Sequence, residues 1–265
     1  MNERDRVPQK VLALDTSTHR MHLALGAAGE SPLAVHAAEG GAQASAQLIP
    51  AVLALLRSVG WRLDELDAIA FGAGPGAFTG LRTACAVVQG LAVAARPGGI
   101  PVLPVPTLQA VAYDGLMQWL AQYPTRADAL TGPVVACLDA RMDEMYVADF
   151  VATRPRAGAT WHLAPNGPAR LVKPDGLTTT GGWPLTPGQP PVWMAGNAAM
   201  AYSERWPPAW QAVPHIAAEP SGPALLALSA AAWRQGAAVP AAEAQPLYVR
   251  DKVAQTTDER RARRA

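Results

Sequence analysis

Charged residues are scarce in this chain, and neither sign prevails. Of its 265 residues only 16% are charged, with 22 basic and 21 acidic side chains and a formal net charge of +1. So even a balance produces no overall electrostatic field that would attract a nucleic acid. Half of the residues are hydrophobic, which is ample for a buried core. The composition favours a globular protein of one large domain or two smaller ones.

Cysteine and long apolar runs are scarce as well. Cys85 and Cys137 both lie in apolar surroundings, which favours buried free thiols over a disulfide and suits a reducing compartment. The charged start of the chain contains no apolar signal segment. The longest weakly polar run, 83–95, is shorter than the roughly 20 residues that a membrane span needs. We expect a cytoplasmic protein that does not contact a membrane.

The glycine-rich stretch AFGAGPGAFTGLRTACAVVQGLA, at 70–92, lacks the residues of the common nucleotide loops. A Walker-type loop needs a lysine for the outer phosphates, and Arg82 is the only cation nearby. The segment GAGPGA at 72–77 does fit the dinucleotide pattern G-x-G-x-x-A, but no acidic residue follows it before Asp114 to hold a ribose. The stretch therefore does not predict a nucleotide-binding loop of either kind.

Hydrophobic periodicity predicts a mixed α/β chain with a faint internal echo. The pattern strand–strand–strand, helix, strand, helix recurs more weakly after Pro133, where a hairpin with its turn at 139–143 begins. Thr107 and Ser221 are plausible N-caps of later helices, and Pro50 should bend a helix or mark its start. The segment 153–191 is rich in Pro, Gly and Thr and reads as irregular loops.

Two helices, at about 45–58 and 79–95, are apolar nearly all round. Such a helix is ordinarily buried on every side, and one of the two would serve as a core helix. Two in one small lobe are harder to cover internally, so we expect one apolar surface to meet a partner. The residues expected at this interface are Leu48, Val52, Leu55, Leu56, Arg82, Cys85, Val88 and Gln89.

Four strings in this order resemble the TsaB (YeaZ) family of tRNA threonylcarbamoyladenosine biosynthesis proteins. They are VLALDTST, the glycine-rich stretch, LDARMDEMYVADF and AEAQPLYVRDKVA, and together they span most of the chain. The resemblance implies the two-lobed fold of actin-like ATPases, sugar kinases and Hsp70, with RNase H-like lobes of which the second is degenerate. We expect lobes at 1–106 and 107–265, with the helix at about 221–235 packing back on the first.

The same resemblance implies a non-catalytic role beside a sister protein, TsaD. TsaD would transfer the threonylcarbamoyl group to the adenosine beside the anticodon, and this chain would bind and activate it as a heterodimer. The ATPase TsaE would join the complex, and tRNA would be met indirectly. No cofactor is implied for this chain itself, although ATP or ADP with Mg²⁺ could bind at the complex interface. In the absence of TsaD, a homodimer would cover the apolar surface.

The turn LDTSTHR leaves a second function open. Asp15, Thr16, Ser17 and Thr18, with Gly74 and Gly76, match the position where this fold class holds phosphate and a metal-bound water. A hairpin turn would favour the same four residues. If they bind phosphate, the chain is an ATP-binding phosphotransferase or ATPase in its own right. No metal site is expected, because the five histidines form no ligand pattern and the helix at 45–58 contains none.

Overall fold

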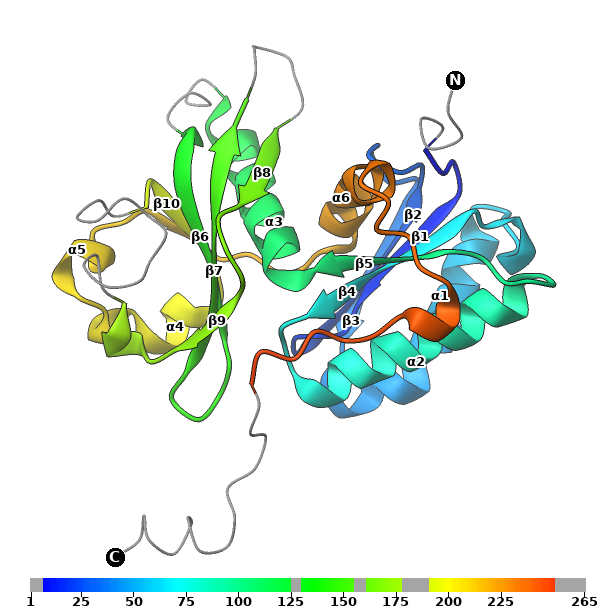
Figure 1. Cartoon of the computed structure of the whole chain (residues 1–265), viewed down its shortest axis with the longest axis horizontal. Coiled ribbons are helices and arrows are strands. Elements are labelled where there is room, and N and C mark those ends of the chain that lie inside the picture. Colours follow the sequence, from blue (N-terminus) through cyan, green and yellow to red (C-terminus); the bar gives the residue numbers. More distant parts are fainter. Residues whose placement is uncertain (1–6, 125–129, 155–160, 178–190, 251–265) are drawn as a thin grey trace, which may run out of the picture.

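Two β-sheets stand side by side in the computed structural model, which describes residues 7–124, 130–154, 161–177 and 191–250. Helix α3 (Thr107–Gln122) follows the last strand of the first sheet directly and lies between the two sheets (Figure 1). Each sheet has helices on both faces, so the chain forms two α/β lobes. The predicted mixed α/β architecture with two lobes is confirmed.

The first sheet combines an antiparallel meander with two parallel strands. Strands β1 and β2 form a tight hairpin, β3 pairs antiparallel with β2, and β4 and β5 continue parallel from β1. In spatial order the strands are β3 (Ala34–Glu39), β2 (Arg20–Gly26), β1 (Val11–Asp15), β4 (Ala68–Gly74) and β5 (Val102–Pro106). The three-strand meander predicted from the alternating pattern is therefore confirmed.

The second sheet repeats this arrangement. An antiparallel β6–β7–β8 meander is continued by parallel strands β10 and β11, and β9 pairs with the first residues of β7. The strands are β6 (Gly132–Asp139), β7 (Met145–Thr153), β8 (His162–Pro165), β9 (Arg170–Val172), β10 (Trp193–Gly196) and β11 (His215–Ile216). The last parallel strand is only two residues long, so the echo seen in the sequence is a reduced copy of the first lobe's sheet.

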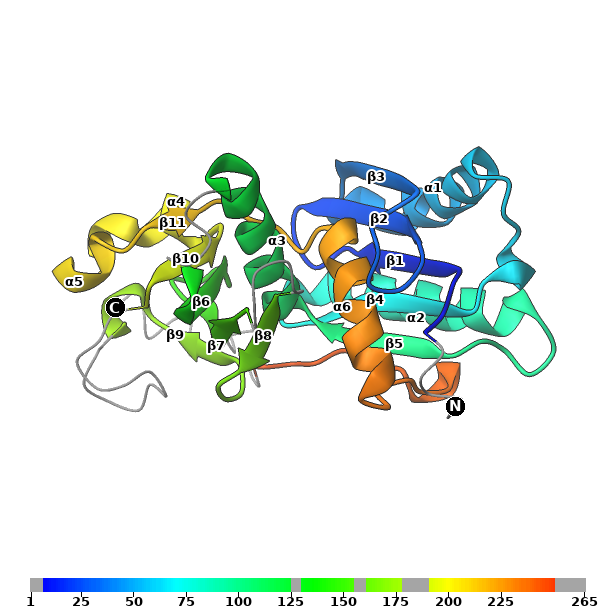
Figure 2. The same ribbon diagram turned by 90° about the horizontal axis from the view of Figure 1, so that it is seen from above.

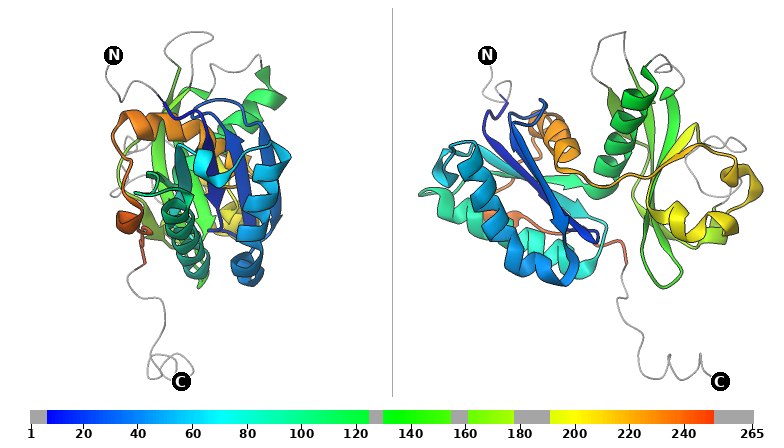
Figure 3. Two further views of the ribbon diagram at one scale, coloured as in Figure 1. Left: turned by 90° about the vertical axis from the view of Figure 1, so that its right-hand side faces the viewer. Right: turned by 180° about the vertical axis from the view of Figure 1, so that it is seen from behind.

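Helices α1 (Ala44–Ser58) and α2 (Phe78–Ala95) lie together on one face of the first sheet (Figure 3, right). They close a core around Leu14, Phe71 and Val88. Helix α1 runs through Pro50 from a start six residues earlier, so this proline does not mark the start of the helix. Helix α2 is the one described helix long and apolar enough to span a membrane, but here it packs on β4 as a core helix does.

The opposite face of the first sheet is covered by α6 (Gly222–Arg234), which arrives from the far end of the chain (Figure 2). Leu225 and Leu226 of α6 are buried against Ala13 and Leu103 of the sheet. Ser221 caps the helix by accepting a hydrogen bond from the Ala224 amide, as predicted. The second lobe also carries the short helices α4 (Ala198–Tyr202) and α5 (Pro208–Gln211), and the 3-10 turn η6 (Ser203–Arg205) lies beside α4. Another 3-10 turn, η7 (Ala241–Glu243), lies beside α2 of the first lobe.

Candidate functional site

The turn between β1 and β2 is organised by its own aspartate. The backbone N–H and the Oγ–H of Ser17 both donate to Asp15 Oδ1, each at 2.7 Å. Thr107 Oγ1 lies 3.5 Å from the other carboxylate oxygen of Asp15, and Thr16 Oγ1 donates to the Gly80 carbonyl at 2.7 Å. These contacts are those of an Asx-type turn tied to its neighbours.

Asp15 is fully buried, and this changes its chemistry. Burial raises the pKa of its carboxyl from 3.8 to about 7, although the hydrogen bonds from Ser17 act in the opposite direction. A carboxylate removed from water favours its neutral form. Asp15 is therefore held inside the turn, with its side chain shielded from solvent.

Thr107 takes part in this cluster, although the sequence predicted it to be a helix cap. Pro106 occupies the N-cap position of α3, and Thr107 is the first helical residue. Its Oγ1 accepts a hydrogen bond from the Gly74 amide at 3.0 Å. The prediction was wrong because Thr107 is fully buried at the junction of β4 and α3, where the loop amide is a closer partner than the helix's own first turn.

The glycines at 72–80 give the loop its close approach to this turn. A Cβ at Gly72 would stand 1.7 Å from Asp15 Oδ2, and one at Gly80 would stand 1.8 Å from the Thr16 carbonyl oxygen. A Cβ at Gly76 would meet Ser17 at 2.6 Å. No side chain fits at these distances, so glycine is required for packing. The glycine-rich stretch is a close backbone contact between β4, α2 and the first turn.

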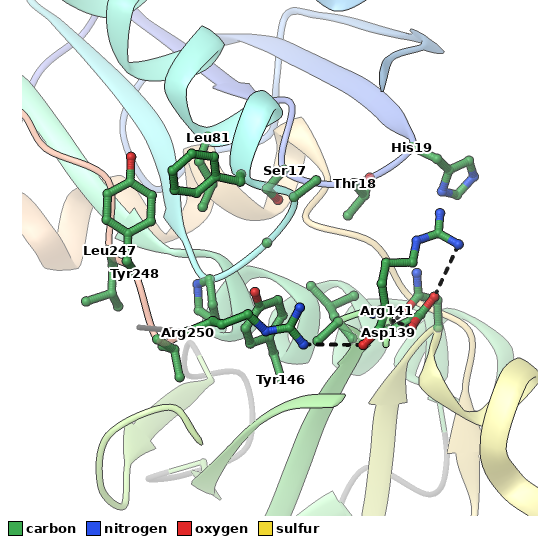
Figure 4. A pocket seen from close by; sticks show the side chains of 18 of the residues that line it. Ser17, Thr18, His19, Leu81, Asp139, Arg141, Tyr146, Leu247, Tyr248 and Arg250 are labelled. Carbon is green, nitrogen blue, oxygen red and sulfur yellow. Dashed lines mark hydrogen bonds and ion pairs between the residues drawn. The ribbon is translucent and has the colours of Figure 1, made fainter. Parts of the chain in front are cut away.

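A cleft of about 500 Å³ opens between the lobes beside this turn (Figure 4). Ser17, Thr18 and Gly76 line it from the first lobe, whereas Asp15 and Thr16 do not reach it. The amide of Ala77, at the start of α2, is already bonded to the Ser17 carbonyl at 2.7 Å. Of the residues expected at a nucleotide-type turn, Ser17, Thr18 and Gly76 thus line the cleft, and Asp15, Thr16 and Gly74 do not. Among the described residues no cluster of His, Cys, Asp or Glu is suited to a metal.

The second wall of the cleft is the tip of the β6–β7 hairpin. Three consecutive residues there have positive φ: Arg141 (61°), Met142 (56°) and Asp143 (66°). Residues other than glycine rarely adopt this conformation, so the surrounding contacts must enforce it. Asp139 accepts from the Arg141 amide at 2.8 Å and from the Tyr202 hydroxyl at 2.9 Å.

The hairpin turn lies where the sequence predicted it, and Arg141, Met142 and Asp143 are exposed at its tip. Its inner side also borders the cleft, with Tyr146 and Asn197 beside it. Residues 247–250, near the chain's end, form a third wall that no sequence pattern indicated. The only available signal was that these residues fall within one of the four strings that carry the family resemblance.

The partner-facing residues expected on α1 and α2 lie elsewhere than predicted. Six of the eight are buried in the chain's own core; they are Leu48, Val52, Leu55, Leu56, Cys85 and Val88. These side chains face the first sheet, since each helix turns its most apolar stripe inward. Of the other two, Gln89 is partly buried and bonded to Ala244, whereas Arg82 is exposed and donates to Tyr248.

An apolar face nevertheless remains uncovered on the same two helices. Ile49 and Leu53 are 43% and 39% exposed on α1, and Val93 is 66% exposed on α2. The small residues Ala86 and Gly90 of α2 are exposed as well. Small side chains allow another helix to come close, so this outer stripe is the part of α1 and α2 that another molecule could meet.

Comparison with known proteins agrees on one family. The family model "TsaD: tRNA N6-adenosine threonylcarbamoyltransferase" matches residues 28–174. The Haemophilus influenzae "tRNA threonylcarbamoyladenosine biosynthesis protein TsaB" is 35% identical over 147 residues, which is 56% of this chain and only 56% of that protein. The Escherichia coli protein of the same name is 26% identical over 92% of this chain and 96% of its own length.

A solved structure covers nearly the whole fold. "YeaZ from Pseudomonas aeruginosa" superposes with a TM-score of 0.69 and is 34% identical, covering 91% of this chain and 99% of that one. The glycine-rich loop and the hairpin tip therefore lie within a fold that the two proteins share. The chain belongs to the TsaB (YeaZ) family, whose names assign it a role in the biosynthesis of tRNA threonylcarbamoyladenosine.

Proposed function

We propose that this chain is a non-catalytic, activating subunit that binds TsaD through the exposed face of α1 and α2. The observation that carries the proposal is the uncovered apolar stripe of Ile49, Leu53 and Val93 beside the small residues of α2. Exposed apolar patches on a well-packed protein mark sites of association. The TsaD-type family model that matches 28–174 includes both helices, which supports a related helix pair as the partner surface.

The non-catalytic part of the proposal rests on the first turn and on α1. Asp15 is buried away from the cleft, and the sequence of α1 contains no histidine that could bind a metal. Threonylcarbamoyl transfer to tRNA would then be carried out by TsaD, with this chain supporting the active arrangement. The complex would act in the cytoplasm, would include TsaE, and would bring this chain only indirectly to tRNA. ATP or ADP with Mg²⁺ would bind at the subunit interface and not at Asp15.

The test is light scattering coupled to size-exclusion chromatography, on this chain mixed with TsaD from the same organism. The native chain should give a heterodimer, and alone it should form a concentration-dependent homodimer that TsaD displaces. Ile49→Asp and Leu53→Asp place a charge in the centre of the stripe and should weaken TsaD binding at least about 30-fold. Because both positions are exposed, the variants should fold normally.

The matched control is Met200→Asp, at a position on α4 that is 81% exposed and lies on the other lobe. This variant should bind TsaD as the native chain does. Normal heterodimers formed by both Ile49→Asp and Leu53→Asp would remove the stripe from the interface. Binding of Mg²⁺–ATP by the isolated chain in calorimetry, if abolished by Asp15→Ala, would instead favour an independent ATPase.

A further inference from the structure

The two lobes are joined by a segment that follows η7 at the end of the described chain. Residues 244–250, here called the strap, run in extended form from α2 to the second lobe (Figures 1 and 2). Their first half is bonded to the first lobe. The Ala244 carbonyl accepts from Gln89 Nε2 at 3.0 Å and from Cys85 Sγ at 3.2 Å, and the Leu247 amide donates to the Ala73 carbonyl at 2.6 Å.

The middle of the strap is held by an aromatic and cationic stack. The rings of Phe78 and Tyr248 lie 5.0 Å apart, and the Arg82 guanidinium lies 3.8 Å from the Phe78 ring centroid. Arg82 Nε also donates to the Tyr248 hydroxyl at 3.2 Å. A guanidinium above an aromatic face is attracted by the ring's electron density. These contacts fix the strap to the N-terminal turn of α2.

The far end of the strap holds the hairpin tip of the other lobe. Arg250 donates to Glu144 Oε2 at 2.5 Å and to the Arg141 carbonyl at 3.3 Å, and its other terminal nitrogen lies 3.3 Å from Met142 Sδ. Only 12% of the Arg250 side chain and 29% of the Glu144 side chain are exposed. A partly buried, charge-assisted contact of this kind is stronger than an exposed ion pair.

Two other connections join the lobes. One is the step from β5 into α3, and the other is the segment that leads from β11 into α6. The second is pinned: Asp114 of α3 accepts from Ser221 Oγ at 2.5 Å, and Glu219 lies 2.9 Å from His22 Nε2. The lobes can hinge about these two connections, and the strap adds a third link between the lobes.

We propose that the strap is a latch, which holds the two lobes closed over the cleft through the contacts of Arg250 with the hairpin tip. Releasing these contacts leaves the strap attached to α2 and frees the hairpin, so the lobes can separate about α3 and the α6 connection. The positive-φ conformation at 141–143 is then maintained in part from the other lobe. Access to the cleft is controlled by the strap and not by the first turn.

Distance measurements between spin labels test the latch. Labels are attached to Leu33→Cys in the first lobe and Met200→Cys in the second, both highly exposed positions, while the native cysteines are buried. Arg250→Ala should lengthen and broaden the distance distribution relative to the native chain. Arg250→Lys, which keeps the charge but cannot make the forked contact, should give an intermediate result.

The matched control is Arg205→Ala. Arg205 forms an ion pair with Asp143 of the same hairpin tip, but from η6 within the second lobe. Its removal should raise hydrogen exchange of the 139–145 amides without changing the distance between labels. A distance distribution for Arg250→Ala equal to that of the native chain would overturn the latch, as would an equal change in both variants. Circular dichroism confirms that each variant is folded.

Discussion

At the scale of single residues, the contact between Gly72 and Asp15 shows how little space the first turn allows. Gly72 Cα faces the carboxylate so closely that an added Cβ would lie 1.7 Å from Oδ2. The Asp15 side chain is held in this position, because its other oxygen accepts two hydrogen bonds from Ser17. Glycine at this position is therefore a packing requirement of the turn.

We expect Gly72→Ala to lower the free energy of unfolding by about 3 kcal/mol, because the methyl group overpacks a fully buried site. Urea unfolding followed by circular dichroism measures this. Gly90→Ala is the control: it lies in α2 with nothing within 4 Å of its added Cβ. That variant should be unchanged or more stable by up to about 1 kcal/mol. Equal effects in the two variants would contradict the close contact.

The raised pKa of Asp15 predicts a pH-dependent stability. The folded pKa of about 7 exceeds the unfolded value of 3.8, so the stability from this group is fully present below about pH 4 and is lost as the pH rises to 7. Asp15→Asn keeps an acceptor for Ser17 but does not titrate. As the pH rises, the free energy of unfolding of the variant should therefore increase relative to that of the native chain, by up to about 4 kcal/mol.

Urea unfolding of both proteins at pH 5 and pH 8 measures the part of this difference that arises between those pH values, about 3 kcal/mol. Comparing the two proteins cancels the contributions of other titrating groups to the pH dependence. One of these is His22, whose pKa is lowered mainly by burial, so its contribution to stability increases with pH. A gap between Asp15→Asn and the native chain that is the same at both pH values would show that Asp15 is ionised throughout.

At the scale of elements, α6 depends on the cap that joins it to α3. Ser221 Oγ accepts from the Ala224 amide at 3.3 Å and donates to Asp114 at 2.5 Å. Its hydroxyl thus caps the first turn of α6 and also ties the segment before α6 to α3. The apolar side of α6 then covers a sheet face that no neighbouring segment in the sequence could cover.

Ser221→Ala should lower the stability by about 1–2 kcal/mol, since it removes an N-cap and leaves Asp114 with one donor fewer. Thermal unfolding measures the loss. Ser221→Asp keeps a capping oxygen but brings a second carboxylate beside Asp114, so it should recover less than half of the stability. Full recovery by aspartate would show that the Asp114 contact contributes nothing.

At the scale of the whole molecule, the first lobe is discontinuous in sequence. Residues 7–106 supply the sheet with α1 and α2, while α6 and the strap come from the end of the chain. The buried face lined by Val11, Ala13 and Ala24 would be exposed to water without Leu225 and Leu226. An exposed sheet face of this apolar character favours aggregation.

We therefore expect residues 1–106, expressed alone, to aggregate or stay unfolded. The same segment joined by a flexible linker to 219–250 should fold and show a cooperative transition. Circular dichroism and light scattering distinguish the outcomes. A monomeric, cooperatively folding 1–106 fragment would show that α6 adds stability but does not complete the lobe.

Local patterns in the sequence account for much of this fold. Alternating and helical periodicity predicted the first meander, the two apolar helices and the hairpin at 139–143, because these patterns reflect local geometry. The four strings predicted the family, which the comparisons confirm. The two cysteines are buried and free, as their apolar surroundings indicated.

Which faces of these elements are buried depends on the packing of the whole chain. Val52 and Val88 look like Ile49 and Val93 in sequence, but the first pair packs on the sheet and the second pair faces outward. Asp15 and Gly72 are 57 positions apart in the sequence, and the hydrogen-bonded residues Arg250 and Glu144 are 106 positions apart. Contacts of this kind depend on how the sheets bring distant segments together, and no local pattern of residues contains that information.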